Sequence, residues 1–195
     1  MSRVWQTVFA LCLAVACAVM AYAGAPAPLP KIGTAPEFRL TDQDGRPFSL
    51  RALRGRVAVV TFIFTSCSST CPVLTAKLVN IQRSLGPDTP RVHFVGITVD
   101  PLHDSPAVLR RYAKAFSAPR ERFSFLTGPI PDIERVVRAY GVFRKAAEGR
   151  EVDHTFLTSI VDRSGTLRVQ YLGWRFDEHE FLGDLRSLVH ERAEP

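Results

Sequence analysis

"RVAVVTFIFTSCSSTCPVLTAKLVNIQRSL", residues 56–85, contains two structural elements and a loop between them. Its first ten residues are almost continuously apolar and rich in β-branched side chains, which is typical of a strand buried on both faces. From Val73 onward, apolar side chains recur at helical spacing. The stretch therefore predicts a central strand, a short loop that carries Cys67 and Cys71, and an α-helix.

The segments on either side predict an α/β domain. Residues 38–50 alternate in polarity around Asp44-Gly45, which is a hairpin signal. Further along the chain we expect a second buried strand over residues 91–99, helices from Ser105, over 131–142 and from Asp177, and a β-hairpin over 155–173. This order predicts an α/β, thioredoxin-like fold with an N-terminal β-hairpin extension and a C-terminal β-hairpin plus helix.

The N-terminus indicates export. Arg3 is the only charged residue among the first 30, and an apolar run follows it. Ala21-Tyr22-Ala23 fits a signal-peptidase site, although the run is almost long enough to remain as an anchor. Lipidation at Cys17 is a weaker alternative, because the residues before it make a poor lipidation motif. We therefore expect a signal peptide or membrane anchor over 1–23, an Ala/Pro-rich linker over 24–36 and a thioredoxin-like domain over 37–195.

Composition sets limits on function. The 195 residues are 46% hydrophobic and carry a formal charge of +6, which fits one globular domain with a moderate basic excess. The arginines are scattered rather than clustered with aromatic residues, so the sequence argues against nucleic-acid binding. A basic surface of this size is still compatible with docking to an acidic partner.

Cysteine usage identifies the candidate site. Cys12 and Cys17 fall in the export segment, so only Cys67 and Cys71 remain in the domain. A disulfide between them would close a very short loop and stabilise the fold little, which favours a chemical role over a structural one. The loop follows a central strand and precedes a helix N-terminus, where thiolates are favoured. Pro72 suits the first helical position and predicts Cys71 as the helix cap.

Five histidines are candidates for a third ligand beside the two thiols. His93 lies in a predicted buried strand, and the last helix places the exposed His179 and His190 on its polar face. His103 and His154 lie in polar segments next to predicted strands, so both stay open as ligands. Asp100 or Asp153 is placed to orient such an imidazole from outside the ligand set, although each also fits a solvated loop.

Three blocks of the sequence resemble the SCO/SenC family of copper chaperones. They are "FTSCSSTCPV", "VDPLHDSP" and "VDHTFLTSIVDRSG", and their order and spacing match over residues 36–188. The resemblance implies a thioredoxin-like fold, an N-terminal membrane anchor, and copper binding by Cys67, Cys71 and His154. The chain departs from the family's usual pattern at Ser68, Ser69 and Thr70, and at Leu102-His103.

The resemblance also implies a function. Members of the family deliver copper to the binuclear copper centre of cytochrome c oxidase, or keep its cysteines reduced. We therefore expect as partners the copper-centre subunit of the oxidase and other copper chaperones or thiol reductants, at the periplasmic face of the bacterial inner membrane. The expected activity is metal transfer rather than enzymatic turnover.

Donor chemistry leaves alternatives open. Thiolates prefer Cu(I) and imidazole also accommodates Cu(II), but zinc accepts the same donors. A thiol-disulfide oxidoreductase would need only Cys67 and Cys71, and a disulfide between them would prevent metal loading. A thiol peroxidase is a third alternative, which the absence of arginine between Val57 and Arg83 disfavours.

Overall fold

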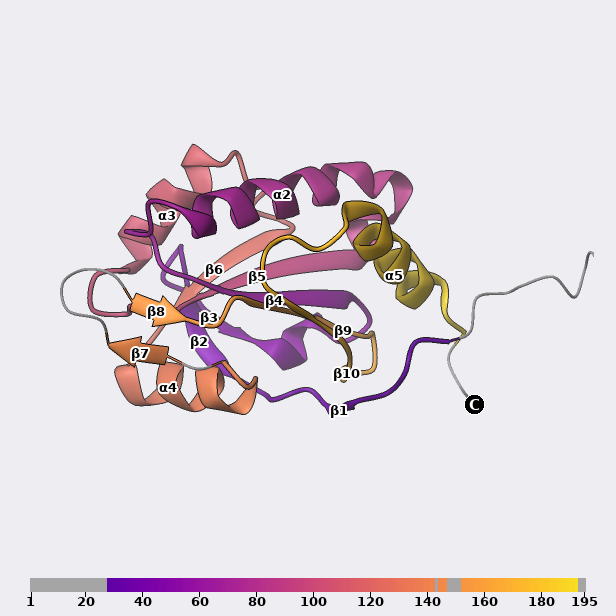
Figure 1. Cartoon of the computed structure of the whole chain (residues 1–195), viewed down its shortest axis with the longest axis horizontal. Helices are drawn as coiled ribbons and strands as arrows, with labels where there is room; N and C mark the ends of the chain where they lie inside the picture. The colour runs from indigo at the N-terminus through magenta and orange to yellow at the C-terminus, as the bar shows by residue number, and fades with distance from the viewer. Residues whose placement is uncertain (1–27, 143, 147–151, 193–195) are drawn as a thin grey trace, which may run out of the picture.

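The computed structural model describes residues 28–142, 144–146 and 152–192. In this part of the chain an eight-stranded sheet has the order β1-β10-β9-β4-β5-β6-β2-β3. Helices α2, α3 and α5 cover one face of the sheet and α4 covers the other (Figure 1). The central units are β4 (Val57–Ile63), α2 (Thr70–Ser84), β5 (Val92–Thr98), α3 (Pro106–Ala115), β6 (Phe123–Thr127) and α4 (Ile130–Ala139).

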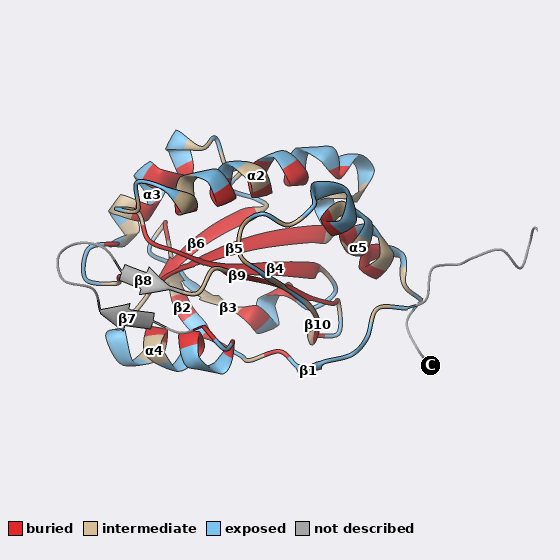
Figure 2. Ribbon diagram, viewed as in Figure 1, coloured by how far each residue is buried: buried red, intermediate tan, exposed pale blue. Residues whose placement is uncertain are grey.

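The three parallel strands β4, β5 and β6 form the core. Every residue of these strands is buried (Figure 2). The continuous apolar pattern predicts this for β4 and β5, whereas β6, a short strand between two predicted helices, was missed because its five residues include Ser124 and Thr127. Val57 of β4 pairs with Val92 of β5, and the register runs to Ile63 opposite Thr98. The strands therefore end side by side, and the loops that follow them meet at one edge of the sheet.

Two β-hairpins flank the parallel strands in the sheet, as predicted. Their strands are β2 (Arg39–Asp42) with β3 (Pro47–Ser49), and β9 (Leu157–Val161) with β10 (Thr166–Leu172). Gly45 and Gly165 adopt φ values of 80° and 84° in the two turns, a conformation that suits glycine. The C-terminal helix α5 (Glu178–His190) is capped by the Asp177 side chain, which accepts from the Glu180 N–H.

The expected linker contains a strand. β1 (Gly33–Thr34) pairs with Leu167 and Thr166 of β10, and Ala35 is buried. A two-residue strand is held by backbone pairing and leaves no periodic signal in the sequence. The predicted leader over residues 1–23 lies outside the described residues. Among those residues, no helix has the length and apolar character needed to span a bilayer.

Two glycines should respond to alanine with opposite signs. A Cβ on Gly96 in β5 would lie 2.8 Å from Cδ1 of the buried Phe125 ring, whereas a Cβ on Gly183 in α5 meets nothing within 4 Å. We expect Gly96→Ala to lower the free energy of unfolding by about 1–3 kcal/mol through overpacking. Gly183→Ala should raise it by about 0.5–1 kcal/mol, because alanine favours the helix.

Urea unfolding followed by circular dichroism measures both effects, with Gly183→Ala as the control for the substitution itself. A Gly96→Ala chain as stable as the parent would show that the Phe125 ring yields without cost.

Candidate thiol and metal site

The cysteine loop leaves β4 at the carboxyl edge of the sheet and turns at once into α2. The Cys67 N–H donates to the Phe64 carbonyl at 3.3 Å, and the helix begins at Thr70 with Ser69 as its cap. The prediction of Cys71 as the cap is therefore wrong by two residues. The reason is that none of the first helical N–H groups has an intrahelical acceptor, so Pro72 is tolerated at the third position as well.

The two thiols lie on either side of the helix N-terminus and are both free. Cys67 is half-buried and its sulfur accepts from the Cys71 N–H at 3.5 Å. A second contact joins that sulfur to the Ser69 Oγ at 3.8 Å. Cys71 is completely buried in the first turn of α2. The sequence correctly predicted that both thiols stand at this helix end.

Burial and hydrogen bonding move the two thiol pKa values in opposite directions. Desolvation would raise the pKa of Cys67, but hydrogen bonds from Cys71 and Ser69 outweigh it and the pKa is lowered. Burial raises the pKa of Cys71 to about 12, and a Cys67 thiolate beside it adds to the rise. Cys67 is therefore the thiolate of the pair, which is the reactive and metal-binding form.

A buried carboxylate fixes the start of the cysteine loop. Asp104 accepts from the Thr65 N–H at 3.1 Å and from the hydroxyls of Thr65 and Thr98. Burial raises the pKa of this carboxyl, against the effect of the threonine hydrogen bonds. Asp104 therefore joins the end of β4 to the end of β5. Its partner after β4, Thr65, lies two residues before Cys67. Sequence reasoning missed this role, because an aspartate ahead of Ser105-Pro106 resembles an ordinary loop residue.

Four of the five histidines can be placed by their side chains. His93 is buried in β5, where its Nε2 lies 2.9 Å from the Ser124 hydroxyl, and burial lowers its pKa to about 4. The exposed His103 has its Nδ1 2.8 Å from the Asp100 carboxylate. Asp100 therefore orients His103. His179 and His190 are exposed on α5, as predicted.

The backbone of His154 lies at the same end of the molecule as the thiols. It ends β8 (Val152–His154), which pairs with β7 (Arg144–Ala146), and both strands lie toward the same left-hand end of Figure 1 as the start of α2. Three residues later Leu157 opens β9, and its carbonyl accepts from the Thr61 hydroxyl of β4. Three residues span at most about 11 Å. The His154 side chain, like that of Asp153, lies outside the described residues, so its role as a ligand stays a prediction.

Donor chemistry at the loop suits a soft ion. Two sulfurs lie at the N-terminus of α2, where the helix dipole and free N–H groups favour negative charge. Among the side chains that the structure describes, no three or more from His, Cys, Asp and Glu are grouped to hold a metal ion. That set contains both cysteines and does not include His154.

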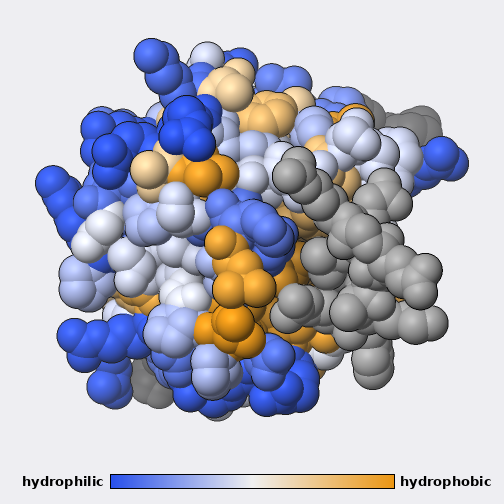
Figure 3. Space-filling model, turned by 90° about the vertical axis from the view of Figure 1, so that its left-hand side faces the viewer, coloured by the Kyte–Doolittle hydropathy of each residue, from blue (hydrophilic) through white to orange (hydrophobic). Residues whose placement is uncertain are grey.

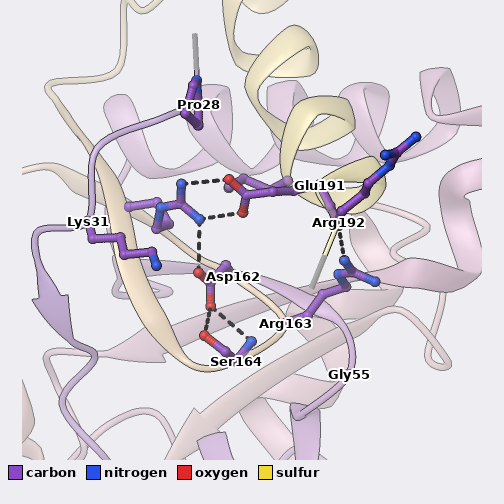
Figure 4. Close-up of a pocket in the computed structure, with 10 residues that line it drawn as sticks. Pro28, Lys31, Gly55, Asp162, Arg163, Ser164, Glu191 and Arg192 are labelled. Carbon is purple, nitrogen blue, oxygen red and sulfur yellow. Dashed lines mark hydrogen bonds and ion pairs between the residues drawn. The ribbon is translucent and has the colours of Figure 1, made fainter. Parts of the chain in front are cut away.

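A cavity of about 640 Å³ opens at the end of the molecule opposite the thiols. Arg168 is buried beneath this cavity, and its guanidinium N–H groups all donate to other groups of the protein. It pairs with Asp162 at 3.0 Å and with both carboxylate oxygens of Glu191 (Figure 4). Its remaining N–H groups donate to the Leu29 and Pro30 carbonyls. With these donors occupied, the arginine holds the two ends of the described chain together.

Known proteins are similar to this chain in sequence and in fold. The family model described as SCO1/SenC matches residues 27–190. An SCO2-like protein of Rickettsia typhi is 33% identical over 141 residues, which cover 69% of this chain and 67% of that protein.

Solved structures of Sco proteins superimpose on the chain. A SCO1/SenC family lipoprotein from Bacillus anthracis gives a TM-score of 0.78 at 27% identity, over 84% of this chain and 100% of that one. Bradyrhizobium japonicum ScoI with copper bound gives 0.71 at 27% identity, over 80% and 99%. BsSco, described with a disulfide switch and as a member of the Sco family of cytochrome c oxidase assembly proteins, gives 0.74 at 26% identity, over 85% and 99%. These matches confirm the predicted thioredoxin-like fold, and the chain belongs to the SCO1/SenC family.

Proposed function

We propose that this chain is a copper-transfer protein. Cys67, Cys71 and His154 bind one copper ion, which is cargo for the binuclear copper centre of cytochrome c oxidase. The observation that carries the proposal is the pair of free thiols at the N-terminus of α2, with Cys67 biased toward the thiolate. The copper-bound ScoI structure of Bradyrhizobium japonicum supports the choice of metal.

The arrangement suits transfer better than storage. Two thiolates and an imidazole make a three-donor set that satisfies Cu(I) and leaves room for an incoming ligand. The half-buried Cys67 stands at the surface and Cys71 stands below it. An acceptor ligand can therefore displace the outer sulfur first. We propose that the protein works on the periplasmic side of the bacterial inner membrane, to which residues 1–23 deliver or anchor it.

Copper loading tests the proposal. A chain with Cys12→Ser and Cys17→Ser keeps Cys67 and Cys71 as its only thiols. We expect it to bind one copper per chain after reduction, and to show thiolate-to-Cu(II) charge-transfer bands when Cu(II) is added anaerobically. Cys67→Ser should abolish the bands, because the more thiolate-like ligand is lost. His154→Ala should weaken Cu(II) binding at least about tenfold.

His103→Ala is the matched control for the histidine. His103 lies at the same edge of the sheet, but its Nδ1 is held by Asp100, so copper affinity should not change. Equal Cu(II) affinity in the parent and in His154→Ala would remove His154 from the ligand set. Failure of the reduced parent to bind copper would overturn the proposed function.

A thiol-disulfide oxidoreductase is the second candidate. The contrast between a half-buried Cys67 of lowered pKa and a buried Cys71 of raised pKa favours it, because such a pair supplies an attacking and a resolving thiol. The disulfide switch named for BsSco points the same way. Metal-free reduction of a partner disulfide, unaffected by His154→Ala, would favour this role over copper transfer.

A further inference from the structure

A cavity of about 540 Å³ opens between α3 and the turn of the β2–β3 hairpin. Its wall carries four exposed cations, which we call the cationic rim: Arg110, Arg111, Lys114 and Arg120. The opposite face of α3 is turned to the core, where Tyr112 bonds to Thr75 of α2 and its ring meets Phe125 of β6 edge-on. Figure 3 views the molecule from the left-hand end of Figure 1, toward which α3 lies, and shows strongly hydrophilic side chains gathered at its left-hand edge.

The charge of its wall distinguishes this cavity from two others of similar size. The cavity of about 640 Å³ at the end opposite the thiols includes Asp162 and Glu191 in its wall. A cavity of about 850 Å³ beside β3 is lined by several arginines but also by Glu37. Within the described chain, no carboxylate lines the cavity at α3. A negatively charged ligand therefore meets only cations there, whereas in the other two cavities it also meets a carboxylate.

One carboxylate holds two members of the cationic rim in place. Asp44, in the hairpin turn, pairs with Arg120 and lies 3.4 Å from the Nε of Arg110. The Nε of Arg110 also donates to the Gln43 carbonyl at 3.1 Å. These bonds fix both guanidinium groups at the cavity wall. A single carboxylate balances only one of the two charges, so this part of the wall stays cationic.

The other two members of the rim have no carboxylate beside them. In the part of the chain that the structure describes, no Asp or Glu lies within ion-pair distance of Arg111 or Lys114. Arg110 and Arg111 stand four and three residues before Lys114, and like charges at these spacings destabilise a helix slightly. Lys114 in the last turn does complement the helix dipole, but three cations exceed the roughly half charge that the dipole supplies. The cluster therefore indicates a binding role rather than a contribution to the fold.

The floor of the cavity is apolar. Ala113 is buried and Ala118 packs partly buried against the core. The Gln43 side chain also lines the cavity, but its amide is occupied, since it donates to the Phe123 carbonyl and accepts from the Phe125 N–H. A ligand that fits this cavity therefore presents apolar groups to the floor and negative charge to the cationic rim.

We propose that the cavity at α3 binds an anionic phospholipid, with its phosphate at the cationic rim and the first carbons of an acyl chain on the alanine floor. Charge complementarity selects the phosphate, which arginine binds through parallel N–H groups and lysine binds as a point charge. The apolar floor selects a ligand with methylene groups, which a free phosphate lacks. A volume of about 540 Å³ also falls within the usual range of small-molecule sites, roughly 300–1,000 Å³.

The lipid site is separate from the thiols. Ser105 caps α3 at the edge of the sheet where the cysteine loop lies, and the cationic rim begins five residues further along. At about 1.5 Å per residue, Arg110 and Lys114 lie roughly 8 and 14 Å along the helix from that cap. A bound lipid therefore holds the domain against a bilayer through α3 and leaves the cysteine loop uncovered. Stable membrane attachment takes two contacts, so this site adds to the anchor proposed for residues 1–23.

Lipid adducts on the intact chain test the proposal. The full chain, kept in a neutral detergent, is titrated with dihexanoylphosphatidylglycerol below its micelle concentration, and bound lipid is counted by native mass spectrometry. We expect one phosphatidylglycerol per chain that equal concentrations of dihexanoylphosphatidylcholine or inorganic phosphate do not displace. Arg111→Gln/Lys114→Gln should weaken this binding at least about tenfold, because two charge-assisted hydrogen bonds to the phosphate are lost.

Arg39→Gln/Arg51→Gln is the matched control. It also removes two exposed arginines, but from the wall of the cavity that contains Glu37. The net charge changes by the same amount, and phosphatidylglycerol binding should match the parent. The midpoint of urea unfolding should not fall in Arg111→Gln/Lys114→Gln, because glutamine is a good helix former and the like-charge pairs are removed. Copper loading should be unchanged in both variants.

Contrary outcomes overturn the proposal in different ways. Equal phosphatidylglycerol binding by the parent and Arg111→Gln/Lys114→Gln would remove the site from α3. Equal adducts of phosphatidylcholine would show acyl-chain binding without recognition of charge, and displacement by inorganic phosphate would show an anion site that ignores the apolar floor. An equal loss in Arg39→Gln/Arg51→Gln would trace binding to net charge alone. None of these results bears on copper transfer, which Cys67 and Cys71 test separately.

Discussion

Iodoacetamide should modify Cys67 at least about tenfold faster than Cys71 in the folded, reduced chain at pH 7.5. Only the thiolate reacts, and the fraction of thiolate depends on the pKa of each sulfur. The pKa of Cys67 is lowered by hydrogen bonds from Cys71 and Ser69 that outweigh desolvation, while burial raises that of Cys71 to about 12. The opposite shifts give Cys67 a much larger thiolate fraction than Cys71, and the greater intrinsic nucleophilicity of the more basic thiolate offsets only part of this advantage.

Mass spectrometry with fragment-level assignment follows the two sulfurs separately on the peptide that carries both. The rate at Cys67 should rise as the pH approaches its pKa and then level off, because the thiolate fraction saturates. The same measurement in concentrated urea is the control, since both thiols then have ordinary pKa values and should react at similar rates. Equal rates in the folded chain would contradict the assignment of Cys67 as the thiolate.

Arg168→Ala should lower the free energy of unfolding by about 3–5 kcal/mol. The side chain is 1% exposed and pairs with Asp162 and Glu191, so its removal leaves the largely buried Asp162 carboxylate without its cation. The Leu29 and Pro30 carbonyls lose their donor as well. Urea unfolding measures the loss. Arg138→Ala is the control, because the exposed Arg138–Glu134 pair should contribute less than about 1 kcal/mol.

The same substitution should change the pH dependence of stability. A hydrogen bond from Arg168 lowers the pKa of Glu191, and bonds from Ser164, Thr166 and Arg168 outweigh desolvation to lower that of Asp162. A carboxylate whose pKa is lower in the folded state stabilises the fold above its unfolded pKa, and this contribution disappears as pH falls through the folded value. The parent should therefore lose more stability than Arg168→Ala on acidification below about pH 4.5. Parallel pH profiles would contradict the ion-pair assignment.

Local patterns explain what the sequence could predict. The buried strand over Val57–Ile63, the cap at Ser105 and the cap at Asp177 each follow from residues within a few positions of one another. Such signals depend on backbone geometry and amphipathic spacing, which the chain carries locally. The placement of the cysteine loop followed from the order of elements alone.

Long-range contacts explain what the sequence could not predict. Asp104 meets Thr65 from 39 residues away, and Arg168 reaches the Pro30 carbonyl across 138 residues. Neither contact leaves a periodic signal, because each depends on how the finished sheet brings loops together. The role of His154 came from the family resemblance, since the residues alone made His103 only the weaker candidate and assigned neither histidine as a ligand.

The ion pairs and hydrogen bonds of Arg168 hold the two ends of the described chain together, which decides where the protein can be attached to other molecules. Pro28 and Arg192, the first and last residues of the described range, line the same cavity at the end opposite the cysteines. A tether, fusion partner or solid support joined at either position therefore leaves the sulfur-bearing end facing outward. Because the two positions are close together, a short peptide joining them should also allow the chain to be reopened elsewhere as a circular permutant.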